Sequence, residues 1–138
     1  MNIKSNVLAV IVTYNPPDNF SENLREVSKQ VEQVLVVDNA STINAVQIHE
    51  TAEVGVSVLS NETNVGIATA LNQGFRWASQ QGFKYVLTLD QDSSPAPEMV
   101  NNLLEVYKSH PEPSSIAIVA PNVVDSAVGI SARYLRSR

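Results

Sequence analysis

The chain has 138 residues, of which 43% are hydrophobic and 17% are charged. This length and balance suit one folded domain with a buried core, and they exclude a disordered or fibrous chain. A formal net charge of −5 argues against a broad basic surface for nucleic acid. The chain has no cysteine, which excludes disulfides and thiolate chemistry.

The chain also lacks the sequence features of a membrane-spanning or secreted protein. No apolar run approaches the roughly 20 residues needed to span a bilayer. The first six residues lack the charged-then-apolar layout of a secretory signal. We therefore expect a cytoplasmic protein with no transmembrane segment, and peripheral association with the inner face of the membrane stays open.

Apolar runs and helical spacing alternate along the chain. Short runs rich in Val, Ile and Leu predict strands buried on both faces of a parallel sheet, at residues 7–12, 34–37, 56–59, 85–89 and 116–120. Apolar residues three and four apart predict helices between them, beginning near Phe20, Ile67 and Val100, with a weaker helix over residues 43–52. This alternation predicts right-handed βαβ units in a three-layer α/β/α domain with a mostly parallel sheet.

Polar residues follow the first four predicted strands. In open α/β sheets ligands bind outside the carboxyl ends of the strands, so these segments predict the site. They are residues 13–16, 38–41, 60–64 and 90–92.

Asp90 and Asp92 follow a clearly buried strand. On an extended backbone, residues i and i+2 point the same way, so the two carboxylates would project together. Two adjacent carboxylates repel unless a cation offsets their charge, and Mg²⁺ or Mn²⁺ prefers oxygen ligands. The alternative is a pair of solvated turn residues.

Asp38 ends the second predicted strand. Its carboxylate could accept hydrogen bonds from a nucleobase N–H or a ribose hydroxyl. With Asn39 and Ser41 beside it, the same residue could instead form an Asx-type turn or helix cap.

Asn64, Val65 and Gly66 precede a long predicted helix. Glycine at a helix N-terminus lets a ligand approach free backbone N–H groups, which favour anions. The alternative is ordinary loop punctuation. The chain has neither the glycine spacing of a dinucleotide fingerprint nor that of a P-loop.

The joint order of these motifs resembles the nucleotide-sugar-binding half of inverting family 2 glycosyltransferases. That resemblance covers about residues 5 to 125, and the segment 87–93 is most similar to the bacterial rhamnosyltransferase branch. It implies a Rossmann-like nucleotide-diphospho-sugar transferase (GT-A) fold in truncated form. Residues 1–138 would be a single nucleotide-sugar-binding domain.

The resemblance also implies roles for the residues that follow the first two strands. Thr13, Tyr14 and Asn15 would line the nucleotide pocket. Asp38 would accept a hydrogen bond from a pyrimidine base.

The remaining motifs would complete the donor site. Asn64 and Gly66 belong to a loop that would help to close over the nucleotide. Asp90 would lie near the ribose and the divalent metal, Mg²⁺ or Mn²⁺, with Asp92 as the more direct ligand. The implied donor is a nucleoside-diphosphate sugar such as dTDP-L-rhamnose, and the implied acceptor is a cell-surface polysaccharide or its lipid-linked precursor.

The catalytic base is not placed by these motifs. Glycosyl transfer requires a base for the acceptor hydroxyl, commonly a carboxylate, and after the fifth predicted strand the chain offers Asp125 alone. The family supplies its base from residues beyond that strand. A non-catalytic nucleotide-sugar-binding fragment is therefore a second interpretation.

Two other classes share this broad layout. A receiver-type signalling domain would have paired acids after the first strand and a Lys after the fifth. A nucleotidyltransferase would have a glycine-rich basic loop after the first strand. Residues 13–17, Thr-Tyr-Asn-Pro-Pro, match neither pattern.

Overall fold

The computed structural model describes residues 6–43 and 55–122. By its internal contacts the chain divides into two compact units, with the boundary between Glu98 and Met99. The first unit contains the sheet and the polar strand ends, and the second contains one α-helix and a short 3₁₀ helix.

A four-stranded parallel sheet forms the centre of the first unit. Its strands are β1 (Val7–Thr13), β2 (Gln33–Asp38), β3 (Val56–Ser60) and β4 (Tyr85–Asp90), in the order β3-β2-β1-β4. All three neighbouring pairs are parallel. The first four predicted strands are confirmed, and each extends to the first polar residue of the motif that follows it.

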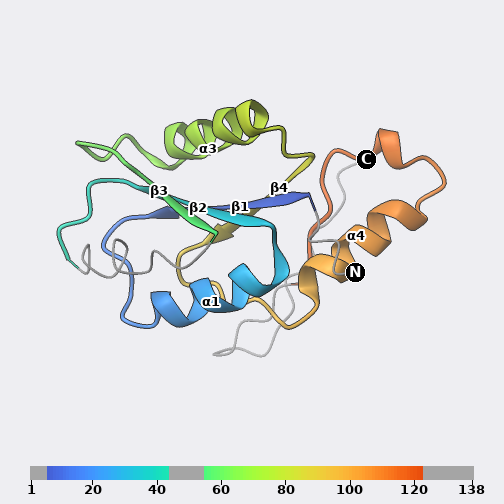
Figure 1. Cartoon of the computed structure of the whole chain (residues 1–138), viewed down its shortest axis with the longest axis horizontal. Helices are drawn as coiled ribbons and strands as arrows, with labels where there is room; N and C mark the ends of the chain where they lie inside the picture. Colours follow the sequence, from blue (N-terminus) through green and yellow to red (C-terminus); the bar gives the residue numbers. More distant parts are fainter. Residues whose placement is uncertain (1–5, 44–54, 123–138) are drawn as a thin grey trace. The chain divides into compact units, whose positions relative to one another are not determined.

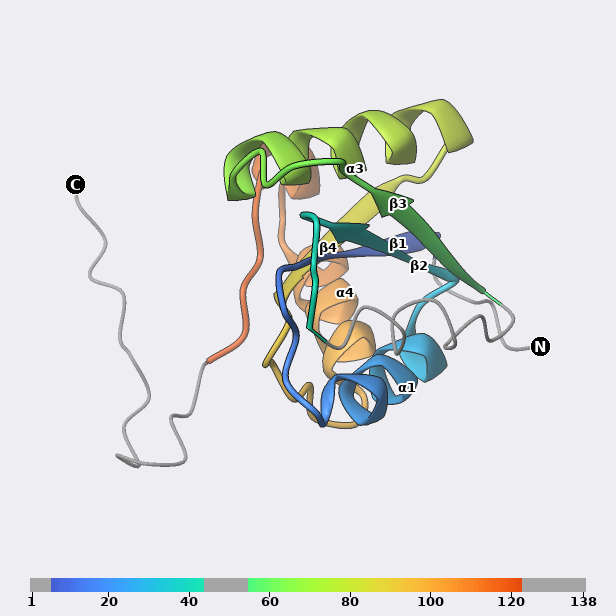
Figure 2. The same cartoon turned by 90° about the vertical axis from the view of Figure 1, so that its left-hand side faces the viewer.

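Helices cover both faces of this sheet. Helix α1 (Phe20–Gln30) lies on one face and α3 (Ile67–Gln81) on the other (Figure 1). The turned view shows the same layering, with the sheet between the two helices (Figure 2). The predicted three-layer α/β/α arrangement is therefore confirmed.

Helix α3 packs on the sheet through small residues. Its buried positions are Ala70, Gly74 and Ala78, and they face Leu8, Val10, Leu35 and Val37 of β1 and β2. Two residues of the apolar stripe predicted for this helix are instead exposed, Ile67 by 60% and Phe75 by 42%. A helix approaches a sheet most closely through a face of small side chains. The face of α3 with Ala70, Gly74 and Ala78 therefore packs on the sheet, and Ile67 and Phe75 stay exposed.

The strand β4 differs from its prediction. Its residues alternate between half-buried and exposed positions, and Val86 is 37% exposed. A strand buried on both faces was expected from its continuous apolar run. β4 is an edge strand of the described sheet, as β3 is, so it has a neighbouring strand on one side alone.

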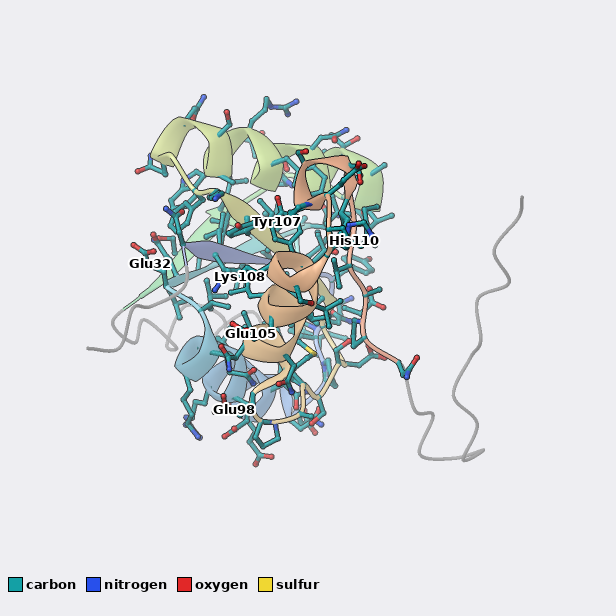
Figure 3. All side chains as sticks on the ribbon, turned by 90° about the vertical axis from the view of Figure 1, so that its right-hand side faces the viewer. Glu32, Glu98, Glu105, Tyr107, Lys108 and His110 are labelled. Carbon is teal, nitrogen blue, oxygen red and sulfur yellow. The ribbon has the colours of Figure 1, made fainter. Side chains whose placement is uncertain are left out.

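The second unit begins with α4 (Met99–Ser109), which the apolar spacing predicted. On its surface Lys108 lies 3.6 Å from Glu105, one helical turn away (Figure 3). The 3₁₀ helix Pro113–Ser115 follows.

The prediction of a fifth strand is wrong. Residues 116–120 have no regular secondary structure, and Ile118 is 85% exposed. Apolar composition alone does not make a strand, because a strand also needs a neighbouring backbone to pair with its N–H and C=O groups. The weaker helix predicted over residues 43–52 lies, except for Ile43, outside the described residues.

We predict that Gly74→Ala destabilises the fold. A Cβ at this position would lie 2.4 Å from Cγ1 of Val10, in the middle of a buried strand. The gain of about 1 kcal/mol in helix propensity from replacing glycine is smaller than or comparable to the cost of overpacking, about 1–3 kcal/mol. Urea denaturation should show a lower free energy of unfolding.

A double variant tests the cause. In Val10→Ala both Cγ atoms are gone, so a further Gly74→Ala change should be neutral or stabilising in that background. Equal destabilisation of both backgrounds would contradict a clash with Val10.

Candidate functional site

A cavity lies at the carboxyl edge of the parallel sheet. Its volume is about 260 Å³, close to the low end of small-molecule sites. The ends of β1, β2 and β4 and the start of α3 supply its lining residues. The lining residues are Val12, Tyr14, Asn39, Asn64, Ile67, Asp90 and Gln91.

Tyr14, Asn64 and Asp90 are the predicted site residues that line this cavity. The other predicted residues surround it without forming its wall. Thr13, Asn15 and Asp38 hold the loops behind it, Gly66 begins α3, and Asp92 follows β4.

Thr13 and Asp38 are paired in the register of β1 and β2, so their side chains leave the sheet on the same face. The Thr13 hydroxyl donates a hydrogen bond of 2.9 Å to Oδ1 of Asp38. Val12, which lines the cavity, precedes Thr13 and points to the opposite face. The buried pair therefore joins the two strand ends behind the cavity.

The carboxylate of Asp38 organises the loop after β2. The backbone N–H of Ser41 donates to Oδ2 at 3.1 Å, and the Ser41 hydroxyl donates to Oδ1. With Thr13, three donors now occupy a carboxylate that is 5% exposed. The bonded N–H lies three residues on, which is the spacing of a helix-cap contact and not of an Asx turn, where it lies two residues on.

Asn15 also stabilises the loop after β2. Its backbone has φ +48°, a left-handed conformation that asparagine tolerates better than most residues. Its Oδ1 accepts hydrogen bonds from the backbone N–H groups of Thr42 and Ile43, at 2.9 and 3.0 Å. The side chain of Asn15 therefore ties the loop after β1 to the loop after β2.

Gln91 joins the first and last strand ends. Its Oε1 accepts from the backbone N–H of Tyr14 at 2.9 Å, and its Nε2 donates to the Tyr14 carbonyl at 3.3 Å. These two bonds fix the backbone of Tyr14, while its side chain is 51% exposed to solvent. Gln91 lies in the predicted segment 90–92, but no role was predicted for it.

Asn39 lies in the predicted segment 38–41, where it was expected to support a turn or cap beside Asp38 and not to face a ligand. It is 3% exposed and lines the cavity on the side of the sheet opposite to Asp38. Its backbone N–H donates to the carbonyl of Thr13 at 2.8 Å, and its Oδ1 accepts from Asn61 Nδ2 at 3.0 Å. Strand alternation could have found it, because a residue next to an inward Asp38 must face the other way.

Asp90 and Asp92 are both exposed, and Asp90 borders the cavity. The backbone N–H of Ser93 donates to the carbonyl of Asp90 at 3.0 Å, which makes residues 90–93 a tight turn. The chain is therefore not extended at Asp92, and Asp92 does not lie on the strand face that was predicted for both carboxylates.

The start of α3 is shaped by Asn64. Its Oδ1 accepts from the backbone N–H of Gly66 at 3.0 Å, and Gly66 has φ +82° at the helix N-cap. This turn brings Asn64 to the cavity wall.

Within the described ranges no group of three or more His, Cys, Asp or Glu side chains could enclose a metal ion. Mg²⁺ is commonly held by only one or two carboxylates, together with waters and substrate phosphates. Asp90 and Asp92 are the carboxylates that this edge of the sheet offers for such a site.

A parallel α/β sheet with its cavity at the carboxyl edge is a Rossmann-like arrangement. The chain belongs to glycosyl transferase family 2, whose family profile matches residues 8–131. The family predicted from the motif order is thus confirmed. The receiver-type and nucleotidyltransferase alternatives are set aside by this match.

Individual relatives agree with the family. The chain is 32% identical over 108 residues to an undecaprenyl-phosphate mannosyltransferase of Micrococcus luteus, covering 75% of this chain and 44% of that protein. It is 35% identical over 103 residues to the dTDP-rhamnosyl transferase RfbF of Shigella flexneri, covering 73% of this chain and 34% of that protein. The matches therefore span less than half of each relative's length.

A solved structure shows the same fold. S. aureus TarS, residues 1–349, superposes with a TM-score of 0.61 and 27% sequence identity, covering 75% of this chain and 32% of that chain. In the part of this chain that the structure describes, no helix is long and apolar enough to cross a membrane.

We predict that Asp38→Asn lowers the free energy of unfolding by about 1–3 kcal/mol, the cost of leaving a buried polar group unpaired. An amide carries no charge and keeps a single acceptor oxygen, so the Ser41 N–H and the two hydroxyls can no longer all donate to it, and the bonds that remain are weaker than those to a carboxylate. Chemical denaturation measures the change. Glu112→Gln, at an exposed position, is the control and should leave stability unchanged. Unchanged stability in Asp38→Asn would contradict this structural role.

Proposed function

We propose that this chain is the donor-binding part of a glycosyltransferase that uses a nucleoside-diphosphate sugar, with residues 1–138 as one nucleotide-sugar-binding domain. The observation that carries the proposal is the cavity at the carboxyl edge, where Asp90 and three side-chain amides meet apolar Val12 and Ile67. Apolar walls with a few convergent polar groups are typical of small-ligand sites. The family match supports the class of ligand.

The residues of the first two strand ends would act on the nucleoside in two ways. Tyr14 and Asn39 would contact it directly, because both line the cavity. Thr13, Asn15 and Asp38 would hold the loops that carry those residues, since their polar atoms already bond to neighbouring protein groups. We assign these three residues to positioning, in place of the direct contacts that the resemblance implies.

Asn64 and Gly66 would close the cavity from the start of α3. The N-terminus of a helix carries a partial positive charge and free N–H groups, which favour an anion such as a diphosphate. An added Cβ at Gly66 would have no atom within 4 Å, so steric space does not require glycine here. Glycine instead permits the positive φ and leaves the backbone open to a ligand.

Asp90 and Asp92 would hold a divalent cation, Mg²⁺ or Mn²⁺. When bound, such an ion neutralises charge that develops on a diphosphate leaving group. Asp90 would also accept a hydrogen bond from the ribose, because it borders the cavity while Asp92 does not line it. The catalytic base stays unassigned.

The relatives narrow the choice of donor sugar and of acceptor. The Shigella flexneri relative supports dTDP-L-rhamnose as donor, whereas the Micrococcus luteus relative is a mannosyltransferase. The undecaprenyl phosphate in the name of the Micrococcus luteus relative supports a lipid-linked acceptor. We extend this to an acceptor at the inner face of the membrane that leads to a cell-surface polysaccharide. We place dTDP-L-rhamnose first because the match to the rhamnosyl transferase has the higher identity.

Calorimetric titration of dTDP and UDP, with and without MnCl₂, tests this proposal. We predict micromolar to millimolar binding that strengthens with Mn²⁺, and at least about a tenfold loss of the Mn²⁺ effect in Asp92→Ala, because an anchoring ligand is removed. Glu22→Gln on α1 removes a distant exposed carboxylate and should bind as the unmodified chain does. Binding that ignores Mn²⁺ in both chains would sink the metal assignment.

Transfer is a separate question from binding. Incubation with dTDP-L-rhamnose and a lipid-linked acceptor, followed by mass spectrometry of the lipid, reports whether a sugar is transferred. Nucleotide binding without any transfer would favour the non-catalytic interpretation of these residues.

A further inference from the structure

The side chain of Gln91 joins the turn after β4 to the loop after β1. Its Oε1 accepts from the backbone N–H of Tyr14 at 2.9 Å, and its Nε2 donates to the carbonyl of the same residue at 3.3 Å. These bonds connect positions that are 77 residues apart in the chain. We refer to the two hydrogen bonds together as the Gln91 clamp.

The register of the sheet explains why a side chain makes this connection. β1 and β4 are paired as far as Val12 and Asp90. The backbone then turns, because the N–H of Ser93 donates to the carbonyl of Asp90 at 3.0 Å. The ladder therefore does not continue beside Tyr14, and the amide of Gln91 supplies the donor and the acceptor that a longer strand would have supplied.

Backbone groups alone fix the orientation of this amide. The N–H of Tyr14 can only donate and its carbonyl can only accept, so a Gln91 amide that turned over would lose both bonds. The orientation of Gln91 therefore does not depend on another side chain that could turn with it.

The clamp lies between the two parts of the proposed donor site. Tyr14, Asp90 and Gln91 all line the cavity. Tyr14 is the residue proposed above to contact the nucleoside, whereas the turn of residues 90–93 carries the two carboxylates proposed above to hold the cation. Gln91 stands between those two aspartates, so the clamp passes a change in the turn to the backbone of Tyr14.

We propose that Gln91 is a positioning residue that couples the cation to the nucleoside: once Asp90 and Asp92 hold an ion, their turn is fixed, and the clamp then fixes Tyr14 against the nucleoside. The proposal rests on the nucleotide-sugar site proposed above and adds a route between its two parts. By linkage, the nucleoside strengthens binding of the ion by the same factor. A diphosphate bonds to the ion directly, so the contribution of Gln91 is isolated with a ligand that has no phosphate.

Thymidine and dTDP provide that comparison, each titrated with and without MgCl₂ and followed by NMR chemical shifts of the 138-residue chain. In the unmodified chain we expect MgCl₂ to strengthen thymidine binding about threefold, the order of one modest hydrogen bond. Gln91→Met keeps the length of the side chain and removes both polar atoms, so it should abolish this effect. The effect of MgCl₂ on dTDP should persist in Gln91→Met, because the diphosphate still shares the ion.

Two further variants separate the clamp from other consequences of the substitution. Gln91→Asn keeps the amide on a side chain that is too short to make both bonds, and it should behave as Gln91→Met does. Gln80→Met makes the same amide-to-thioether change at an exposed position of α3, and it should behave as the unmodified chain does in every titration.

A measurement without nucleoside reports on the clamp itself. The backbone amide proton signal of Tyr14 should move upfield in Gln91→Met, because the N–H loses its acceptor. MgCl₂ alone should move the amide signals of both Ser93 and Tyr14 in the unmodified chain. In Gln91→Met it should move the Ser93 signal and leave the Tyr14 signal in place.

The outcomes separate the coupling from the site on which it rests. Loss of the thymidine effect in Gln91→Met, with the dTDP effect retained, supports the proposal. It is overturned by an equal thymidine effect in both chains, by a Tyr14 signal that still responds to MgCl₂ in Gln91→Met, or by no thymidine effect in an unmodified chain whose dTDP binding does respond. An unmodified chain that binds neither dTDP nor Mg²⁺ would contradict the proposed function, and the coupling with it.

Discussion

The site depends first on the parallel register of β1 and β2, which places Thr13 opposite Asp38. Their hydrogen bond is buried, so replacing it with water is not possible without opening the sheet. The carboxylate then accepts from Ser41, and Asn15 secures the following residues of the same loop. One buried carboxylate thus organises two loops that together carry the cavity wall.

Strand alternation converts this arrangement into a division of roles. Residues on one face of the sheet hold the loops, whereas their neighbours in sequence face the α3 side and line the cavity. Thr13 and Asp38 belong to the first group, and Val12 and Asn39 belong to the second. The small face of α3, with Gly74 against Val10, brings the helix close enough to form the remaining wall.

Much of this could be predicted from the chain itself. Each of the first four strands and each of the three described α-helices was expected from apolar runs and spacing, because burial requires those patterns. The strand at residues 116–120 was not formed, because composition cannot supply a pairing partner. The same limit applies to Asp90 and Asp92, where a turn closed by Ser93 replaced the extended backbone that the spacing argument assumed.

The amino-acid sequence by itself determined the α/β class, the family and the edge of the sheet at which the site lies, because periodicity and motif order are properties of the chain. The tertiary structure alone decided which polar residues face the ligand. That choice depends on register and on side-chain pairing between distant segments, such as Gln91 with Tyr14 and Asn61 with Asn39. Those contacts join residues up to 77 positions apart, which no local pattern can report.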